Sequence, residues 1–301
     1  MLAGDIDDFV GYLQNNRRLS AHTVSNYKRD LAKLLLFCAE REIDDTAQLQ
    51  TGDVRDFIAR EHRRGLSGRS IQRLLSAVRS LYRYLNSMHG LKHNPAVGIQ
   101  APKAARLLPK AAEVDELQHF LNMPTDSWIG CRDNAMFELL YSSGLRLDEL
   151  VSLNITELHL NEGRGEVRVS HGKGDKARVV PIGRVARTAL TDWLKRRAER
   201  ATPEQQQAVF ISQRGQRISP RSVQARLRYW SQRQGLRQNL HPHMLRHSFA
   251  SHLLQSSGEL RALQEMLGHA NISTTQVYTH LDYQHLAAVY DKAHPRAKGK
   301  K

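Results

Sequence analysis

The sequence has few cysteines and no long apolar run. Its 301 residues include only two cysteines, Cys38 and Cys131. Two thiols cannot form a disulfide framework or a cysteine-based zinc finger, and they fit a reducing cytosol. No apolar stretch approaches the ~20 residues that a membrane-spanning helix needs. The acidic N-terminus lacks the basic start of a secretory signal. We therefore expect a cytoplasmic protein.

Acidic residues are also scarce relative to basic ones. The chain has 45 Lys and Arg against 30 Asp and Glu, a formal net charge of +15. This excess argues against a typical acidic metabolic enzyme and favours a polyanionic partner. An anionic membrane surface is the weaker choice, because the chain has no apolar segment to match it. Nucleic acid is the stronger one.

Part of the positive charge is concentrated in one strip. Residues 60–92 hold eight basic residues and a single acidic one, Glu61. A solvated helix face is the plain alternative, but the near absence of acids favours contact with a phosphate backbone. The arginines of this basic strip that we predict to bind DNA are Arg60, Arg63, Arg64, Arg69, Arg73, Arg79 and Arg83.

Hydrophobic spacing divides the chain into two domains. Residues 1–100 show only helical periodicity and predict a small four-helix domain, with the fourth helix opening at Ser70. Prolines mark 101–109 as a linker. Residues 110–295 predict a mixed domain, with helices near 113–122 and 129–141 and a hairpin of strands 166–170 and 177–181. Residues 296–301 read as a basic tail. The fold class is mainly α with a small antiparallel sheet.

The sequence has neither a phosphate-binding P-loop nor a carboxylate cluster suited to Mg²⁺. What it offers for chemistry is a set of basic residues, histidines and a tyrosine in short segments. Each has an ordinary explanation by itself, such as Arg146 pairing with Glu149 on the surface. His243 and His247 are spaced like a zinc pair, but no third ligand is evident. The candidates are Arg146, Lys173, His243, Arg246, His269 and Tyr278.

Taken together, these residue types suit phosphoryl transfer without a metal or a nucleotide. Two arginines can clamp the nonbridging oxygens of a phosphodiester by charge-assisted hydrogen bonds. A histidine near neutral pH can donate or accept a proton, and a lysine can protonate a leaving alkoxide. A tyrosine hydroxyl can attack phosphorus and hold a covalent intermediate. Such an intermediate keeps the bond energy for rejoining.

Four motifs carry a resemblance to a known family. They are SGLRLDEL, GKGDKARVVP, HPHMLRH and LGHANISTTQVYTH, and they occur in the family's order with family-like spacing. The chain resembles the tyrosine site-specific recombinases of the phage integrase family over nearly its whole length. The resemblance implies a SAM-like core-binding domain and a catalytic domain that together form a C-shaped clamp on duplex DNA.

The resemblance also implies residue roles, with no metal or other cofactor. Arg146 and Arg246 would bind the scissile phosphate, and His269 would hydrogen-bond to it. Lys173 would be the general acid for the 5′-hydroxyl, and His243 would take part in proton transfer. Tyr278 would form a 3′-phosphotyrosyl intermediate, and Glu149 would support Arg146.

Partners are implied in the same way. The chain would act on a dif-type site with a second, related recombinase, two copies of each, together with a DNA translocase, to resolve chromosome dimers. A C-terminal helix at about 283–293 would pack through Leu286, Val289 and Tyr290. The residues alone do not distinguish packing on the same chain (in cis) from packing on a neighbouring protomer (in trans). The resemblance favours packing in trans. A DNA-binding protein without chemistry and a type IB topoisomerase-like enzyme are the competing interpretations.

Overall fold

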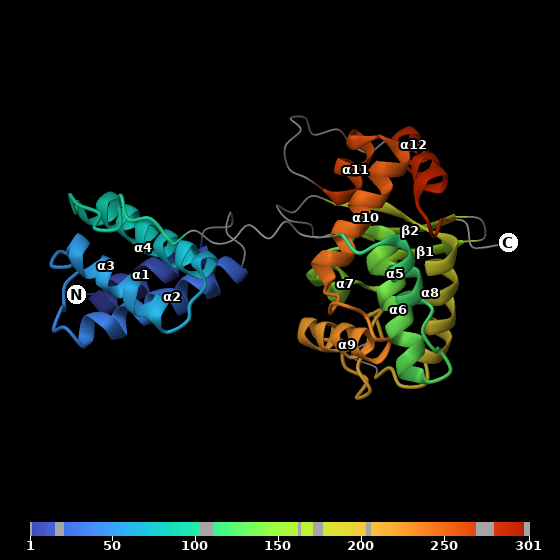
Figure 1. Ribbon diagram of the computed structural model, residues 1–301, viewed down its shortest axis with the longest axis horizontal. Helices are drawn as coiled ribbons and strands as arrows, with labels where there is room; N and C mark the ends of the chain where they lie inside the picture. Colours follow the sequence, from blue (N-terminus) through green and yellow to red (C-terminus); the bar gives the residue numbers. More distant parts are fainter. Residues whose placement is uncertain are drawn as a thin grey trace. The chain divides into compact units, whose positions relative to one another are not determined.

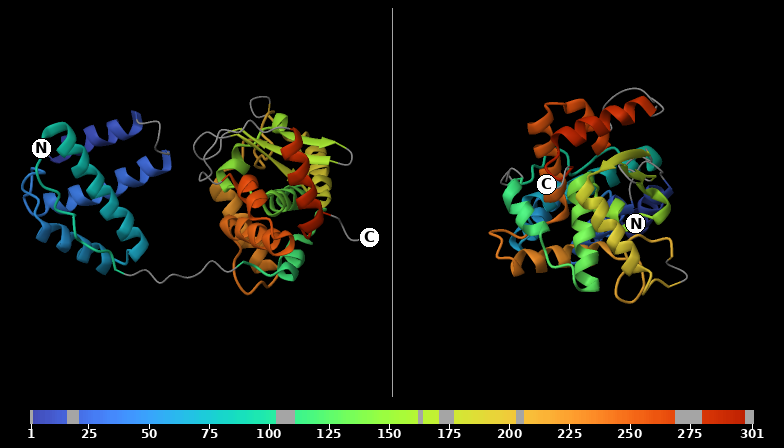
Figure 2. Two further views of the ribbon diagram at one scale, coloured as in Figure 1. Left: turned by 90° about the horizontal axis from the view of Figure 1, so that it is seen from above. Right: turned by 90° about the vertical axis from the view of Figure 1, so that its right-hand side faces the viewer.

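A computed structural model describes residues 2–15, 21–102, 111–161, 164–170, 177–202, 206–268 and 280–297. The chain forms two compact units, Met1–Leu107 and Leu108–Lys301 (Figures 1 and 2). Across the described ranges, no helix is long and apolar enough to cross a membrane. Both cysteines carry free, buried thiols.

The N-terminal unit has the four predicted helices, α1 (Leu2–Asn15), α2 (Ala21–Ala39), α3 (Thr51–Arg63) and α4 (Gly68–His89). The long α4 buries one apolar face, including Leu74, Leu81 and Tyr82, in the unit's core. The predicted start of α4 at Ser70 is wrong. Ser67 caps the helix by accepting a hydrogen bond from the Ser70 backbone N–H, so Gly68 already lies inside it.

The C-terminal unit combines helices with one small sheet. Its helices are α5 (Val114–Leu121), α6 (Trp128–Ser143), α7 (Leu147–Ser152), the 3₁₀ turn η1 (Ile155–Glu157), α8 (Arg184–Arg197), α9 (Pro220–Arg233), α10 (Pro242–Ser257), α11 (Leu260–Leu267) and α12 (His280–Ala293). Strands β1 (Leu158–Asn161), β2 (Arg164–Val169) and β3 (Arg178–Ile182) pair antiparallel in the order β1-β2-β3. The fold class is confirmed. The hairpin is present, and β1 is an additional strand that the sequence did not reveal.

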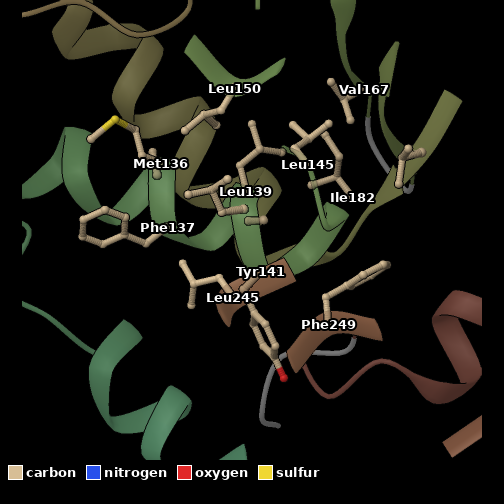
Figure 3. Close-up of a cluster of buried hydrophobic side chains, with 14 of the residues drawn as sticks. Met136, Phe137, Leu139, Tyr141, Leu145, Leu150, Val167, Ile182, Leu245 and Phe249 are labelled. Carbon is tan, nitrogen blue, oxygen red and sulfur yellow. The ribbon is translucent and has the colours of Figure 1, made fainter. Parts of the chain in front are cut away.

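Helix α6 runs through the core of this unit. It is buried on nearly every side and packs against α8, α10 and strand β3. Figure 3 shows Leu139 and Tyr141 of α6 among side chains from α7, α10 and the sheet. The end of α6 is therefore rigid, and the segment that follows it, beginning at Gly144, has a fixed starting point.

Helix α12 packs in cis in this structure of one chain, and packing in trans on a neighbouring protomer stays a prediction. Leu286, Val289 and Tyr290 are buried in the core of their own unit, where α12 contacts α10 and β3. The Tyr290 hydroxyl hydrogen-bonds with the Ser142 hydroxyl, which also accepts the N–H of Gly183. The helix thus contributes apolar side chains to the core and one buried hydrogen bond between Tyr290 and Ser142.

The start of the predicted basic tail also needs correction. Arg296 lies in a buried two-pronged ion pair with Glu138 of α6, and Ala297 is buried. The Arg184 N–H donates to the Ala297 carbonyl at 3.2 Å. Residues 296 and 297 belong to the folded unit because Glu138 provides a buried counter-charge. Residues 298–301 lie outside the described ranges.

Candidate active site

Arg146 lies at the junction between α6 and α7. Helix α6 ends at Gly144, whose φ of 60° is the left-handed conformation that glycine adopts without strain. A side chain there would also collide with the ring of Phe249. Arg146 is then the N-cap of α7, and its backbone N–H donates to Glu149 Oε2 at 2.7 Å. The glycine and the cap together fix the backbone position from which the Arg146 side chain extends.

Arg246 reaches the same place from α10. His241 caps this helix, its ring Nδ1 accepting the Met244 backbone N–H at 3.2 Å, and Pro242 occupies the first turn. Arg246 donates to the Gly144 carbonyl and, at 2.7 Å, to the Leu267 carbonyl. Two segments 102 residues apart in the chain are thereby brought together at one arginine.

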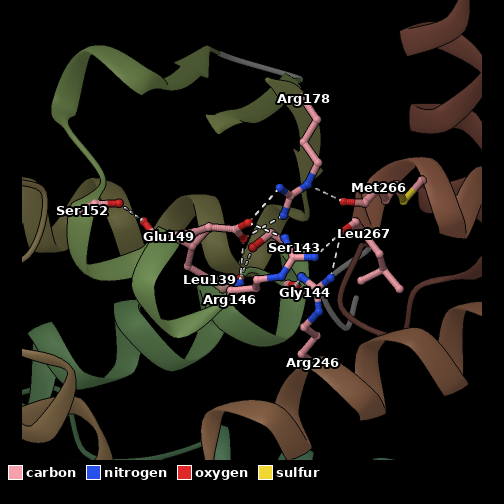
Figure 4. A network of polar contacts seen from close by, with 10 residues as sticks. All are labelled: Leu139, Ser143, Gly144, Arg146, Glu149, Ser152, Arg178, Arg246, Met266 and Leu267. Atoms are coloured by element: carbon pink, nitrogen blue, oxygen red, sulfur yellow. Dashed lines mark hydrogen bonds and ion pairs between the residues drawn. The ribbon is translucent and has the colours of Figure 1, made fainter. Parts of the chain in front are cut away.

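The carbonyl of Leu267 is shared by two arginines. It accepts Arg246 Nη2 at 2.7 Å and, over a longer contact of 3.5 Å, Arg146 Nη2 (Figure 4). This oxygen is at the C-terminal end of α11, where helix carbonyls lack internal partners and carry partial negative charge. The two guanidinium groups therefore converge on an oxygen, as they would in a phosphate clamp.

Glu149 holds a third arginine that the sequence analysis did not single out. Its Oε1 accepts Arg146 Nη1 at 2.7 Å and Arg178 Nη1 at 2.9 Å, and its Oε2 accepts Arg178 Nη2 at 2.8 Å. Arg178 is almost fully buried on β3 and also donates from Nε to the Met266 carbonyl at 2.8 Å. Arg178 could have been identified from the sequence by its position in the strand. It precedes the buried Val180 and Ile182 by two and four residues, so its side chain lies on the same buried face of β3.

Charge at this site is unbalanced among the described residues. Burial raises the pKa of Glu149, but the hydrogen bonds and charge of Arg178, with those of Arg146, hold it at about 2. Burial and then the charge of Arg146 lower the pKa of Arg246 to about 10. Three guanidinium groups thus surround one carboxylate. The excess positive charge is suited to an anion such as a phosphodiester.

The structure describes His243 but not the other three candidates. His243 is exposed in the first turn of α10, three residues before Arg246, so the two share a helix face. Lys173, His269 and Tyr278 lie outside the described residues. No three His, Cys, Asp or Glu side chains come close enough to hold a metal ion in the described part of the chain.

The basic strip of the N-terminal unit has mixed roles. Arg73 makes a two-pronged ion pair with the buried Asp30, at 2.8 and 3.0 Å. Arg79 donates to the carbonyls of Ala96 and Ile99. Arg60 and Arg64 pair with glutamates. Arg63, Arg69 and Arg83 are exposed, and none of them pairs with a carboxylate among the described residues. Arg60, Arg73 and Arg79 therefore support the domain itself, which the sequence did not anticipate, whereas Arg64 pairs with Glu61 with 59% of its side chain exposed.

Comparisons with known proteins agree with this architecture. Residues 110–285 match the phage integrase family, and residues 6–89 match the phage integrase N-terminal SAM-like domain. The chain is 52% identical to tyrosine recombinase XerC of Pseudomonas aeruginosa strain LESB58 over 300 residues, which cover 99% of this chain and 97% of that one. It is also 52% identical to XerC of Azotobacter vinelandii over 301 residues, covering 100% and 99%.

Solved structures give the same result for the fold. A post-cleavage complex of the XerH site-specific recombinase with a palindromic difH substrate matches at a TM-score of 0.69 and 25% identity, over 89% of this chain and 79% of that one. The Tn1549 transposon integrase, in complex with transposon right-end DNA, matches at 0.73 and 17% identity, over 93% and 97%.

The chain therefore belongs to the phage integrase family of tyrosine recombinases, enzymes that cut and rejoin DNA. Its N-terminal unit is the family's SAM-like domain, and its C-terminal unit is the catalytic domain.

Proposed function

We propose that this enzyme performs site-specific recombination of duplex DNA through a 3′-phosphotyrosyl intermediate formed by Tyr278. The observation that supports this most is the pair Arg146 and Arg246, which approach one carbonyl oxygen from two separate segments. A phosphodiester oxygen in that position would accept charge-assisted hydrogen bonds from both. The excess positive charge would stabilise the further negative charge that develops during transfer.

The remaining residues complete the proposed reaction. The Tyr278 oxygen attacks phosphorus, and the 5′-oxygen leaves with a proton from Lys173. His243 assists proton transfer at the nucleophile, and His269 donates to a nonbridging oxygen. Glu149 keeps Arg146 in place. Attack by a 5′-hydroxyl of a partner duplex reverses these steps and exchanges the strands.

A nicked duplex tests the chemistry directly. A nick close to the cleavage point releases a short fragment, so rejoining fails and the covalent complex accumulates. We expect a protein–DNA adduct that survives denaturant with the wild-type chain and is absent with Tyr278→Phe. Tight DNA binding without any adduct would instead indicate a binding protein.

A chemical rescue tests the role of Lys173. We expect Lys173→Ala to slow cleavage of an ordinary duplex. A 5′-bridging phosphorothioate leaves without a proton, so it should restore cleavage if Lys173 is the general acid. An equal defect on both substrates would remove Lys173 from that role.

The biological setting is part of the same proposal. The chain is similar to proteins named tyrosine recombinase XerC. From the family resemblance of its motifs we propose that it acts in the cytoplasm on a dif-type site, with a XerD-like recombinase, two copies of each, and with the translocase FtsK, to resolve chromosome dimers. A synapsis assay with two labelled dif-type duplexes tests this. Exchange of strands between the duplexes that needs the partner recombinase supports it. Relaxation of one supercoiled duplex without exchange would favour a topoisomerase-like activity.

A further inference from the structure

Arg178 connects three segments that carry candidate catalytic residues. Through Glu149 it is joined to Arg146, and through its Nε it is joined to the Met266 carbonyl. Met266 lies one residue before Leu267, whose carbonyl accepts both Arg246 and Arg146. Along the chain, Arg178 follows Lys173 by five residues, and α11 ends just before His269.

The side chain of Arg178 is not placed to touch DNA. It is 2% exposed, and its Nε and both Nη atoms donate to protein oxygens at 2.8 to 2.9 Å. Arg146 differs, because 27% of its side chain is exposed and its longer bond to Leu267 is easily replaced. Arg178 can therefore affect a reaction only through the groups that it holds.

Gly268 shows how closely α11 is fitted to this arginine. A Cβ atom at residue 268 would lie 3.2 Å from Arg178 Cδ, and the φ of 65° is already a conformation that other residues rarely adopt. The end of α11 thus packs directly on the Arg178 stem. The Arg178 guanidinium holds Glu149, and the aliphatic stem of Arg178 lies against Gly268.

We propose that Arg178 is a positioning residue of the strand-transfer site, holding Arg146 through Glu149 and the end of α11 through Met266. This inference rests on the proposed function of the site. Arg178 makes no contact with the phosphate. It fixes the distance between two segments that contribute to the clamp, and small displacements of such groups cost about 100-fold in rate.

The first test replaces the bridge and measures cleavage. Arg178→Met keeps an unbranched apolar stem, shortens the side chain and removes all three hydrogen bonds. With saturating nicked duplex, we expect single-turnover adduct formation to slow by roughly 10- to 100-fold, with the DNA dissociation constant changed by less than about threefold. Thermal unfolding of each variant reports whether the domain remains folded.

The pH dependence separates positioning from simple loss of stability. The charged groups around Glu149 among the described residues are Arg146 on α7, Arg178 on β3 and Arg246 on α10. Without Arg178, burial raises the pKa of Glu149, so its carboxylate gains a proton as the solution becomes acidic and releases Arg146. The ratio of variant to wild-type rate should therefore fall from pH 8 to pH 5. Adding Glu149→Gln to Arg178→Met should remove that trend.

Two further variants complete the design. Arg178→Lys keeps a positive charge beside Glu149 but cannot bridge it to Met266, so we expect a slower rate with a wild-type pH dependence. Arg132→Met is the matched control. Arg132 is also buried and pairs with a buried carboxylate, Asp133, which has Arg226 as its second arginine. We expect lower stability and a nearly normal rate for this control.

The outcomes are distinguishable. If the wild-type chain forms no adduct, both the proposed function and the positioning role of Arg178 are wrong. If the wild type forms an adduct and Arg178→Met cleaves equally fast at every pH, Arg178 has no positioning role. The same conclusion follows if Arg178→Met and Arg132→Met slow cleavage equally and without a pH trend. Should Arg178→Met fail to fold, Arg178→Lys decides by its rate.

Discussion

Glu149 joins two arginines through a single carboxylate. Both of its oxygens accept charge-assisted hydrogen bonds, and Oε2 also accepts the backbone N–H that begins α7. A carboxylate so bonded is strongly favoured in its ionised form. The same group therefore supports both the start of a helix and the arginine that we assign to the phosphate.

This arrangement predicts a pH-dependent contribution to stability. The pKa of Glu149 falls from its ordinary 4.5 to about 2 in the folded chain, which corresponds to about 3 kcal/mol. Because the folded pKa is lowered, this contribution is present above about pH 4.5 and is lost as the pH falls through about 2. Urea unfolding of wild type and Glu149→Gln should show a large stability difference at pH 7 and a smaller one at pH 3.

A surface carboxylate provides the comparison. Glu199 is exposed beyond the end of α8, and Glu199→Gln should match wild type at both pH values. A stability difference for Glu149→Gln that stayed constant from pH 7 to pH 3 would mean that ionisation of Glu149 does not stabilise the fold.

At this scale the sequence indicated some contacts and not others. The spacing of Arg146 and Glu149 is a local, three-residue signal, and their ion pair is present in the structure. Arg178 was missed because its partners are 29 and 88 residues away and no local pattern points to them. Contacts between distant segments depend on the completed fold, which spacing alone does not supply.

At the scale of elements, the C-terminal segment is anchored at two points. Helix α12 buries its apolar face, and Arg296 forms its ion pair with Glu138. Removing one partner of a buried ion pair leaves the other charge in a low-dielectric interior and costs about 3–5 kcal/mol. Burial raises the pKa of Glu138 to about 7 even with Arg296 beside it. We therefore expect Arg296→Gln to destabilise the C-terminal unit by up to that amount in urea unfolding at pH 8, and by less at pH 6, where Glu138 is protonated.

The control is a pair of the same charges on the surface. Arg261 and Glu265 pair on α11, where 74% of the arginine side chain is exposed. Arg261→Gln should cost less than about 1 kcal/mol. Removing both charges of the buried pair, with Arg296→Met and Glu138→Leu, should cost less than Arg296→Gln alone. Equal losses for Arg296→Gln and Arg261→Gln would contradict the anchor.

Element boundaries were predictable where a proline or a terminal glycine marks them, but the start of α4 was misplaced because Ser67 and Ser70 are both possible caps. Pro220 and Pro242 begin α9 and α10, and the glycines after α6 and α11 end those helices. Strand β1 was missed because its four residues are half-buried or exposed, and only pairing with β2 makes them a strand. The anchored C-terminal segment was missed for a similar reason, since a basic stretch looks solvated until Glu138 is placed beside it.

At the scale of the whole molecule, the charge excess divides between structure and DNA binding. The ion pair of Arg73 with Asp30 and the carbonyl contacts of Arg79 stabilise the N-terminal unit. We therefore predict that the exposed arginines Arg63, Arg69 and Arg83 dominate binding to phosphates. Changing all three to glutamine should flatten the dependence of binding on salt by about 0.9 in log–log slope for each phosphate that is no longer neutralised.

A matched triple variant checks that prediction. Arg41, Lys195 and Arg261 are exposed cations that each pair with a carboxylate. Changing these three to glutamine removes the same formal charge and should leave the salt slope nearly unchanged. If both triple variants flatten the slope equally, net charge rather than the basic strip governs binding. Filter binding across a salt series gives the slopes.

The late position of Arg296 along the chain has a consequence for synthesis. Domains fold as units while the chain is still being made, the N-terminal one first. Until residue 296 has been made, the catalytic unit carries Glu138 without its counter-ion, and until residue 290 has been made, Ser142 lacks Tyr290. We therefore expect the buried contacts of α6 to be completed only after residue 296 has left the ribosome.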